Sequence, residues 1–142
     1  VARVKQALLD IQKVNPIELV VMDTSKAEDV ADWIRTEIGA DVVDRTQSNK
    51  FAVNDFNCWM EAMRSGWLFH TGDPVLREHV LNAVAKVLPG GDARFDRPKR
   101  ARIATGQDRR VIDGLTAASM VNSAYAALFA DEEESPGNWR PM

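Results

Sequence analysis

The sequence predicts a single α/β domain. Two apolar, β-branched runs of strand length, Ile17–Met22 and Ala40–Arg45, are separated by a segment with helical periodicity. A helix that crosses between two strands makes them parallel neighbours, so residues 17–45 form a predicted βαβ unit. With 142 residues, of which 45% are hydrophobic, the chain is long enough for one core and too short for two ordinary domains.

The first helix is predicted over residues 2–14, where apolar residues recur at three- and four-residue spacing. The expected buried stripe comprises Val4, Leu8, Ile11 and Val14. Asn15-Pro16 ends this helix, because a residue before proline avoids helical backbone angles. The strand that follows is apolar throughout, which is typical of a strand covered on both faces, and it ends at Asp23.

The crossover helix is expected to begin at a cap supplied by Thr24 or Ser25 and to stop at Gly39 in the left-handed conformation. Its predicted buried face comprises Val30, Trp33, Ile34 and Ile38. Another helix is predicted over residues 53–65, ended by Gly66. Its apolar side comprises Phe56, Trp59, Met60 and Met63.

The C-terminal half is punctuated by proline and glycine. Trp67–His70 is predicted to be extended, and Asp73 with Pro74 opens a helix to about Val84. Residues 85–104 are irregular, which leaves open a β-hairpin or a disordered flap. A long helix is predicted over 108–129 and an acidic flexible tail over 131–142, so the predicted domain covers 1–130.

Composition narrows the class of protein. The formal charge of −3 excludes a globally basic nucleic-acid coat, although it leaves room for a local basic face. The single cysteine, Cys58, can form neither an intramolecular disulfide nor a zinc site. No apolar run reaches the roughly 18–20 residues of a membrane span, so a cytosolic protein is expected. The chain starts at Val1 within a helical pattern, which predicts a piece of a longer polypeptide.

Two carboxylates lie at positions suited to chemistry. Asp23 follows a strand, and open α/β sheets hold ligands at the C-terminal ends of their strands; its alternative role is to cap the next helix. Asp113 lies near the start of the last helix, where its alternative role is to interact with the helix dipole. Together they suggest oxygen ligands for Mg²⁺ or Mn²⁺ in a phosphate-ester site. A third acid is expected, with no candidate on a strand that evidently neighbours Asp23; the candidates are Asp41, Asp44, Asp73 and Asp108.

A run of cations precedes Asp113 and predicts a contact with the DNA backbone, the alternative being a solvated surface. It comprises Arg94, Arg97, Lys99, Arg100, Arg102, Arg109 and Arg110. Of the two histidines, His79 is expected on a helix surface, and His70 either has a structural role or binds phosphate. No Walker A pattern is present, so ATP hydrolysis is not expected.

The order of these features resembles the nuclease domain of tailed-phage terminase large subunits, over about Ala7–Leu128. IELVVMD is similar to the family's strand that ends in its second catalytic aspartate, here Asp23. RRVIDGLTAASM resembles the closing motif, in which Asp113 takes the third catalytic position. Gln47 matches a glutamine that follows the second strand. The segment from Arg64 to Val84 resembles the family's histidine, Gly-x-Pro-Val and asparagine series, here His70, Pro74, Val75 and Asn82.

The resemblance implies an RNase H-like mixed sheet flanked by helices and a metal-dependent endonuclease that cuts concatemeric double-stranded DNA during packaging. Asp23 and Asp113 would be catalytic and would hold two Mg²⁺ or Mn²⁺ ions, with support from His70 and Gln47. The DNA would contact Arg97, Lys99, Arg100, Arg102, Arg109 and Arg110. The implied partners are DNA, the terminase ATPase domain, the small terminase subunit and the portal, in the host cytoplasm and without a membrane.

Two departures from the family pattern keep alternatives open. The family's first catalytic aspartate lies on a strand upstream of the point where this chain begins, so the first strands are expected to be missing and the fragment alone could be inactive. A lysine that often precedes the isoleucine-aspartate pair is replaced by Val111. The alternatives are a non-catalytic module that binds DNA or docks on the portal, and an RNase H-like resolvase or integrase.

Overall fold

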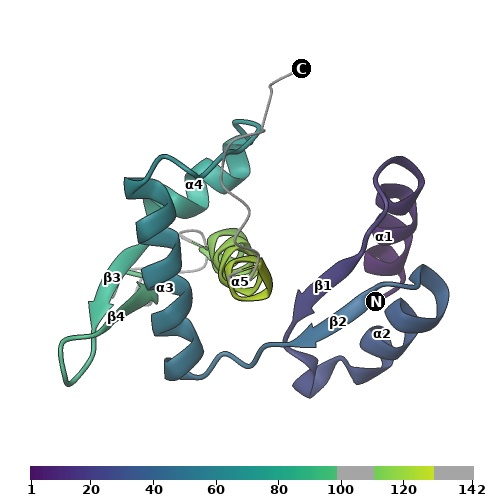
Figure 1. The fold of residues 1–142 in the computed structure, drawn as a ribbon, viewed down its shortest axis with the longest axis horizontal. Coiled ribbons are helices and arrows are strands. Elements are labelled where there is room, and N and C mark those ends of the chain that lie inside the picture. The colour runs from purple at the N-terminus through teal and green to yellow at the C-terminus, as the bar shows by residue number, and fades with distance from the viewer. Residues whose placement is uncertain (99–110, 130–142) are drawn as a thin grey trace, which may run out of the picture.

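The computed structural model describes residues 1–98 and 111–129 (Figure 1). Its elements in chain order are α1 (Ala2–Val14), β1 (Leu19–Met22), the 3-10 turn η1 (Thr24–Lys26), α2 (Glu28–Trp33), the π-helical turn η2 (Ile34–Ile38), β2 (Asp41–Asp44), α3 (Asn49–Arg64), α4 (Pro74–Asn82), β3 (Val84–Val87), β4 (Ala93–Asp96) and α5 (Asp113–Phe129). The predicted helix over 108–129 can be compared only from residue 111 onward, and the predicted tail over 131–142 not at all, because residues 99–110 and 130–142 lie outside the described residues.

The predicted βαβ unit is confirmed. β1 and β2 pair in parallel, with Leu19 opposite Asp41 and Met22 opposite Asp44. The crossover formed by α2 and η2 buries Val30, Ile34 and Ile38, and it ends at Gly39 with φ of 76°. This left-handed backbone angle suits glycine, because it has no Cβ to clash with the following carbonyl.

Three expectations for the N-terminal half were wrong in whole or in part. In α1, Leu8 packs against the core as predicted, together with Leu9, but the other members of the predicted stripe, Val4, Ile11 and Val14, are exposed, Val14 at 78%. Neither Thr24 nor Ser25 caps α2, whose N-cap is Ala27 without a side-chain bond. β1 is half-buried along its length rather than fully covered on both faces.

The C-terminal half contains a β-hairpin, which settles the choice between a hairpin and a flap for residues 84–96. β3 and β4 are antiparallel, and the turn between them uses Gly90 and Gly91 at positive φ. α3 begins at Asn49, earlier than predicted, and α4 ends at Asn82, where the chain enters β3. Trp67–His70 joins neither of the two sheets that the described residues form.

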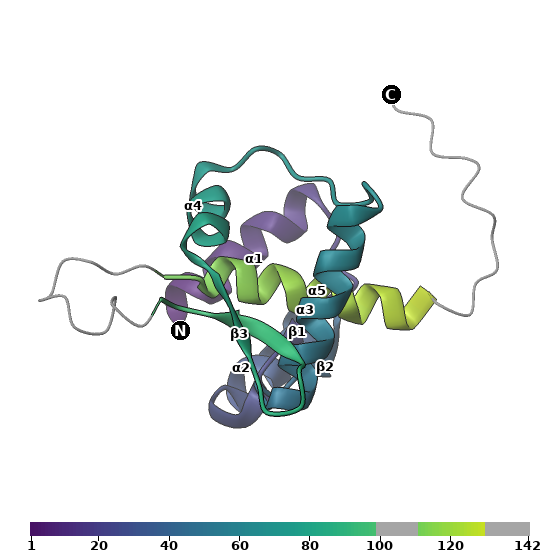
Figure 2. The same ribbon diagram turned by 90° about the vertical axis from the view of Figure 1, so that its left-hand side faces the viewer.

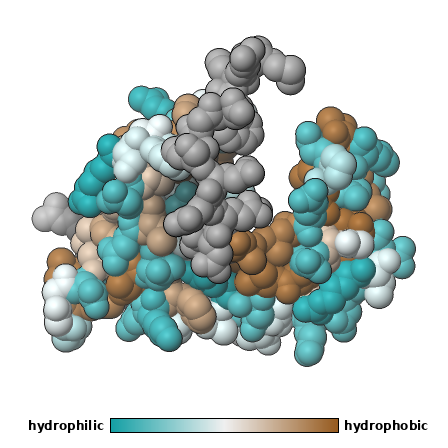
Figure 3. Space-filling model, in the orientation of Figure 1, coloured by the Kyte–Doolittle hydropathy of each residue, from teal (hydrophilic) through white to brown (hydrophobic). Residues whose placement is uncertain are grey.

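α5 is the central element of the molecule. It packs against α3, α4 and β1, and Figures 1 and 2 show it between the β1–β2 pair and α3. The buried residues of α5 are Leu115, Ser119, Met120, Ser123 and Ala124. Figure 3 shows apolar atoms gathered where α5 approaches the parallel strands. α5 therefore packs on β1 on one side and on α3 on the other, and α3 in turn packs on β4.

The predicted α/β class, with strands flanked by helices, is confirmed with one difference. The parallel and antiparallel strand pairs form two separate sheets instead of one mixed sheet. None of the helices within the described ranges has the length and apolar character needed to cross a membrane.

Candidate functional site

An open pocket of about 190 Å³ lies beside the N-terminus of α5. Its lining comes from the loop after β2, from α3, from β4 and its end, and from α5. The lining residues are Thr46, Gln47, Ala52, Asp55, Arg94, Phe95, Asp96, Arg97, Ile112, Asp113, Thr116, Ser119 and Met120. Three predicted site residues, Gln47, Arg97 and Asp113, thus meet in one place although they are far apart in the sequence.

Asp113 is the first residue of α5, and its exposed carboxylate forms an ion pair at this pocket. Its side chain is 73% exposed, and its Oδ1 accepts a hydrogen bond from Arg97 Nη2 at 2.9 Å. An exposed carboxylate at the first turn of a helix also interacts favourably with the helix dipole. The dipole role considered from the sequence and a ligand role are therefore compatible at this position.

β4 supplies two more charged groups to the pocket. Arg94 donates from Nη1 to Asn49 Oδ1 at 3.0 Å, while its buried Nε has no hydrogen-bond partner among the described residues. Burial raises the pKa of Asp96, but the Arg97 N–H and the Lys86 ammonium, 3.5 Å away, bring it below its ordinary value. The pocket therefore contains an ionised carboxylate and a cation beside Asp113.

Asp23 is not a lining residue of this pocket. It ends β1 as predicted, and its Oδ1 accepts hydrogen bonds from the Ser25 N–H at 3.1 Å and the Ser25 hydroxyl at 2.6 Å. The cap role considered from the sequence is thus confirmed for the short turn η1.

Asp44, not recognised from the sequence as a neighbour of Asp23, lies at the end of the adjacent strand. It is the register partner of Met22, and its Oδ1 accepts from the Thr24 N–H at 3.0 Å and the Thr24 hydroxyl at 2.8 Å. The Thr24 N–H and hydroxyl lower the pKa of Asp44, and the negative charge of Asp23 opposes this. The expectation that no candidate acid neighbours Asp23 was therefore wrong.

None of the remaining candidates for a third acid is placed by the structure beside Asp23 or Asp113. Asp41 starts β2 at its opposite end, Asp73 caps α4 by accepting from the Leu76 N–H at 2.8 Å, and Asp108 lies outside the described residues. Within residues 1–98 and 111–129, no group of three or more His, Cys, Asp or Glu side chains is arranged to hold a metal ion.

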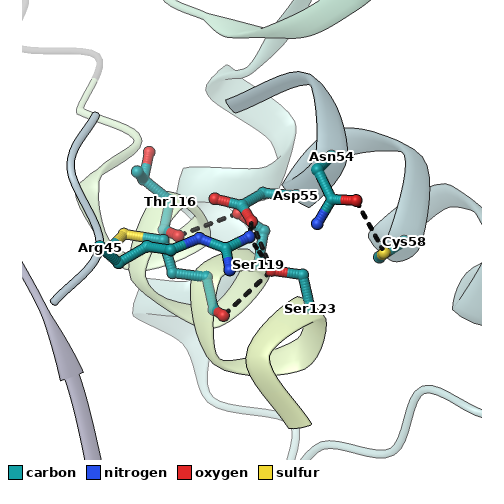
Figure 4. Close-up of polar contacts among 8 residues, drawn as sticks. Arg45, Asn54, Asp55, Cys58, Thr116, Ser119 and Ser123 are labelled. Atoms are coloured by element: carbon teal, nitrogen blue, oxygen red, sulfur yellow. Dashed lines mark hydrogen bonds and ion pairs between the residues drawn. The ribbon is translucent and has the colours of Figure 1, made fainter. Parts of the chain in front are cut away.

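A buried polar network that was not predicted from the sequence supports one wall of the pocket. Arg45, which follows β2, donates to Asp55 of α3 and, at 2.7 Å, to the hydroxyl of Ser123 in α5. Ser123 also donates to Asp55, so the three groups point toward one another (Figure 4). Arg45 and Asp55 are 8% and 6% exposed. Because Asp55 lines the pocket, this network fixes its wall to β2, α3 and α5 together.

The sequence did carry a signal for Asp55. Ala52, Asp55, Phe56 and Trp59 share helical spacing, so a carboxylate interrupts the apolar face of α3. A charge on such a face needs a buried partner. The partner itself could not be predicted, because Arg45 and Ser123 come from other elements.

No protein-family model and no curated protein matches the sequence. Among solved structures, the crystal structure of the HK97 bacteriophage large terminase superposes with a TM-score of 0.62 at 22% sequence identity. The fold is terminase-like. The match covers 84% of this chain but 24% of that protein, so the chain spans about a quarter of the terminase that it resembles.

Of the residues that the family resemblance predicts to contact DNA, the structure describes only Arg97. Arg97 is exposed at the pocket, with its side chain 48% accessible. Lys99, Arg100, Arg102, Arg109 and Arg110 lie outside the described residues. Of the supporting residues, Gln47 lines the pocket, whereas His70 does not; its Nδ1 accepts from the Gly72 N–H at 2.9 Å in an exposed turn. A structural role for His70 fits this geometry.

The expectation that His79 lies on a helix surface was wrong. It is half-buried, and its Nδ1 accepts a hydrogen bond from the N–H of Gly114 at 2.7 Å. Helical spacing did not reveal this contact, because α4 packs across the start of α5 and brings together residues that are 35 positions apart.

Proposed function

We propose that this chain belongs to the nuclease part of a phage DNA-packaging terminase, and that it takes part in metal-dependent cutting of concatemeric double-stranded DNA. The terminase-like fold carries this proposal, and the meeting of Gln47, Arg97 and Asp113 in one pocket supports it. The implied partners are DNA, the terminase ATPase domain, the small subunit and the portal, in the host cytoplasm.

The donor set at the pocket fits Mg²⁺ or Mn²⁺ chemically. Both ions prefer oxygen ligands, and Asp113, Asp96 and Gln47 present carboxylate and amide oxygens to one cavity. Asp23, at the end of β1, would hold a second ion. When bound, such ions activate water and stabilise the leaving 3′ oxygen in phosphodiester cleavage.

The protein's own groups would bind and orient the DNA backbone. Arg97 is exposed and lies beside Asp113, so it would place a phosphate next to the carboxylate. Arg94 would add a second positive charge from the pocket wall. Lys99, Arg100, Arg102, Arg109 and Arg110 would extend this contact along the backbone, which predicts sequence-independent binding that weakens steeply with salt.

The deciding experiment is nicking of supercoiled plasmid in Mn²⁺ by the wild-type chain, Asp113→Asn and Asp92→Asn. Asp92 is a matched control, because it is an exposed aspartate in the hairpin turn. We expect nicking that EDTA and Asp113→Asn abolish and that Asp92→Asn leaves unchanged. Equal nicking by Asp113→Asn would reject Asp113 as a catalytic residue.

A second candidate is a non-catalytic module that binds DNA or docks on the portal. It is favoured by Asp23 lying outside the lining of the Asp113 pocket and by the lack of a three-acid group among the described residues. Under this candidate, no variant nicks DNA in any metal, while Arg97→Ala still weakens DNA binding. Asp23→Asn separates the two candidates further, because only the nuclease requires that carboxylate.

A further inference from the structure

The first turn of α5 is capped by a residue from another helix. Gly114 is the second residue of α5, and its N–H points out of the helix without an intrahelical partner, as at every helix start. The residue before α5 is Ile112, whose aliphatic side chain cannot accept a hydrogen bond. Nδ1 of His79 takes that role from α4, at 2.7 Å from the Gly114 nitrogen.

The identity of Gly114 is matched to this imidazole. A Cβ built on Gly114 would lie 2.6 Å from Nδ1 of His79 and 3.3 Å from its Cε1. Nonbonded atoms do not approach that closely, so any side chain at 114 would displace the ring or the start of α5. Gly114 has a helical backbone, and its lack of a side chain is therefore needed for the approach of His79 rather than for a special φ angle.

A second residue of α4 holds the other side of the same turn. Asn82 lies one helical turn after His79, and its Nδ2 donates to the Val111 carbonyl at 3.4 Å. His79 and Asn82 thus contact the backbone on either side of Asp113. The carboxylate itself stays exposed and faces the pocket with Arg97.

We propose that His79 is a positioning residue for Asp113. By accepting the Gly114 N–H, it fixes the start of α5 and so the direction in which Asp113 presents its carboxylate to the pocket. The contact requires the tautomer with a bare Nδ1 and the proton on Nε2. This role in metal binding rests on the proposed function, whereas the hydrogen bond and the start of the helix can be measured without it.

NMR spectroscopy of the whole chain tests the contact directly. We expect a scalar coupling across the hydrogen bond between the Gly114 amide nitrogen and Nδ1 of His79, and helical Cα shifts at Asp113. His79→Leu removes the acceptor, so the Asp113 shifts should move toward coil values. His79→Asn places an oxygen near the position of Nδ1 and should restore them. Unchanged Asp113 shifts in His79→Leu would overturn the proposal.

Binding of Mn²⁺, followed by broadening of the Asp113 and Gly114 signals, supplies the functional readout. Residues that orient a metal ligand typically contribute about 10–100-fold to metal affinity. We expect His79→Leu to weaken Mn²⁺ binding by at least about tenfold and His79→Asn to recover most of that loss. If the two variants are equally impaired, His79 acts through packing alone and the proposal is rejected.

Two controls make the outcome specific. His70→Leu removes a similar bond, from Nδ1 to the Gly72 N–H, in a turn outside the pocket, and should change neither readout. Gly114→Ala should disturb the Asp113 shifts in the wild-type background but far less in a His79→Ala background, because alanine leaves no atom in the place of Nδ1. If wild-type protein binds no Mn²⁺, the proposed function fails, while the Asp113 shifts still decide whether His79 positions this residue.

Discussion

Arg97 holds the carboxylate of Asp113 at the mouth of the pocket, with 2.9 Å between Nη2 and Oδ1. The two side chains are 48% and 73% exposed, so water screens the pair and its contribution to stability is small. A phosphate could replace the carboxylate as the partner of Arg97, and a divalent cation could replace Arg97 as the partner of Asp113. The ion pair between Arg97, proposed to bind DNA, and Asp113, proposed to bind metal, would therefore compete with both ligands.

The variant Arg97→Ala separates these two effects. Loss of one phosphate contact should weaken DNA binding across all sequences and reduce the slope of log K against log salt by about 1. Mn²⁺ binding should become tighter, because no guanidinium competes for Asp113. Fluorescence anisotropy at several salt concentrations and a Mn²⁺ titration would measure both changes.

Arg77→Ala is the matched control for this prediction. Arg77 is an exposed arginine of α4 and is absent from the lining of the pocket. It should leave the salt slope and the Mn²⁺ affinity close to the wild-type values. If Arg97→Ala and Arg77→Ala give the same salt slope, Arg97 makes no phosphate contact of its own.

The hairpin should show a pH dependence through Asp96. Burial raises the pKa of Asp96, but the opposite effect of the Arg97 N–H and Lys86 is larger. The pKa of Asp96 in the folded state therefore lies below its ordinary value of about 3.8. Because the folded state favours the ionised form, this stabilisation is fully present above the ordinary pKa and is lost as pH falls through the folded-state pKa. Lys86→Gln should raise the pKa of Asp96 and shift acid unfolding to higher pH.

A titration of the Asp96 carboxyl carbon by NMR would check this directly. Lys50→Gln, an exposed lysine on α3, removes the same charge at a distance and serves as the control. An Asp96 pKa that is unmoved by Lys86→Gln would mean that the 3.5 Å ion pair is screened by water in solution.

The parts of the fold that could be predicted from sequence are those set by local chemistry. The apolar runs predicted β1 and β2. Gly39 predicted the end of the crossover, where its φ is 76°. Asp73 with Pro74 predicted the start of α4. The buried face of α1 was predicted only at Leu8, because residues 4–14 offer two overlapping apolar faces. Packing against α2 and η2 selects Leu8 and Leu9.

The site was predictable only in its individual residues. Asp113 and Arg97 were singled out from sequence patterns and Gln47 from the family resemblance, and the structure places all three around one pocket. Several contacts that hold the pocket join residues far apart in the sequence: His79 and Gly114 are 35 positions apart, and Arg45 and Ser123 are 78 positions apart. No periodicity within a helix records such pairs, since each depends on how two elements cross.

The network of Arg45, Asp55 and Ser123 gives the largest stability prediction. Removing one partner of a buried ion pair leaves the other charge desolvated and costs about 3–5 kcal/mol. Asp55→Asn should therefore lower the free energy of unfolding by that amount in urea denaturation. Asp32→Asn is the control, because it breaks the exposed pair of Asp32 with Arg35 and should cost no more than about 0.5 kcal/mol.

Replacement of both partners distinguishes charge burial from packing. The double variant with Arg45→Met and Asp55→Val leaves no buried charge and stays close to the original side-chain volume, so it should recover most of the stability lost in Asp55→Asn. Its Ser123 hydroxyl still donates to the Met120 carbonyl at 3.2 Å and is not left without a partner. If the double variant is less stable than Asp55→Asn, the ion pair itself, and not the penalty of an unpaired charge, stabilises the junction of β2, α3 and α5.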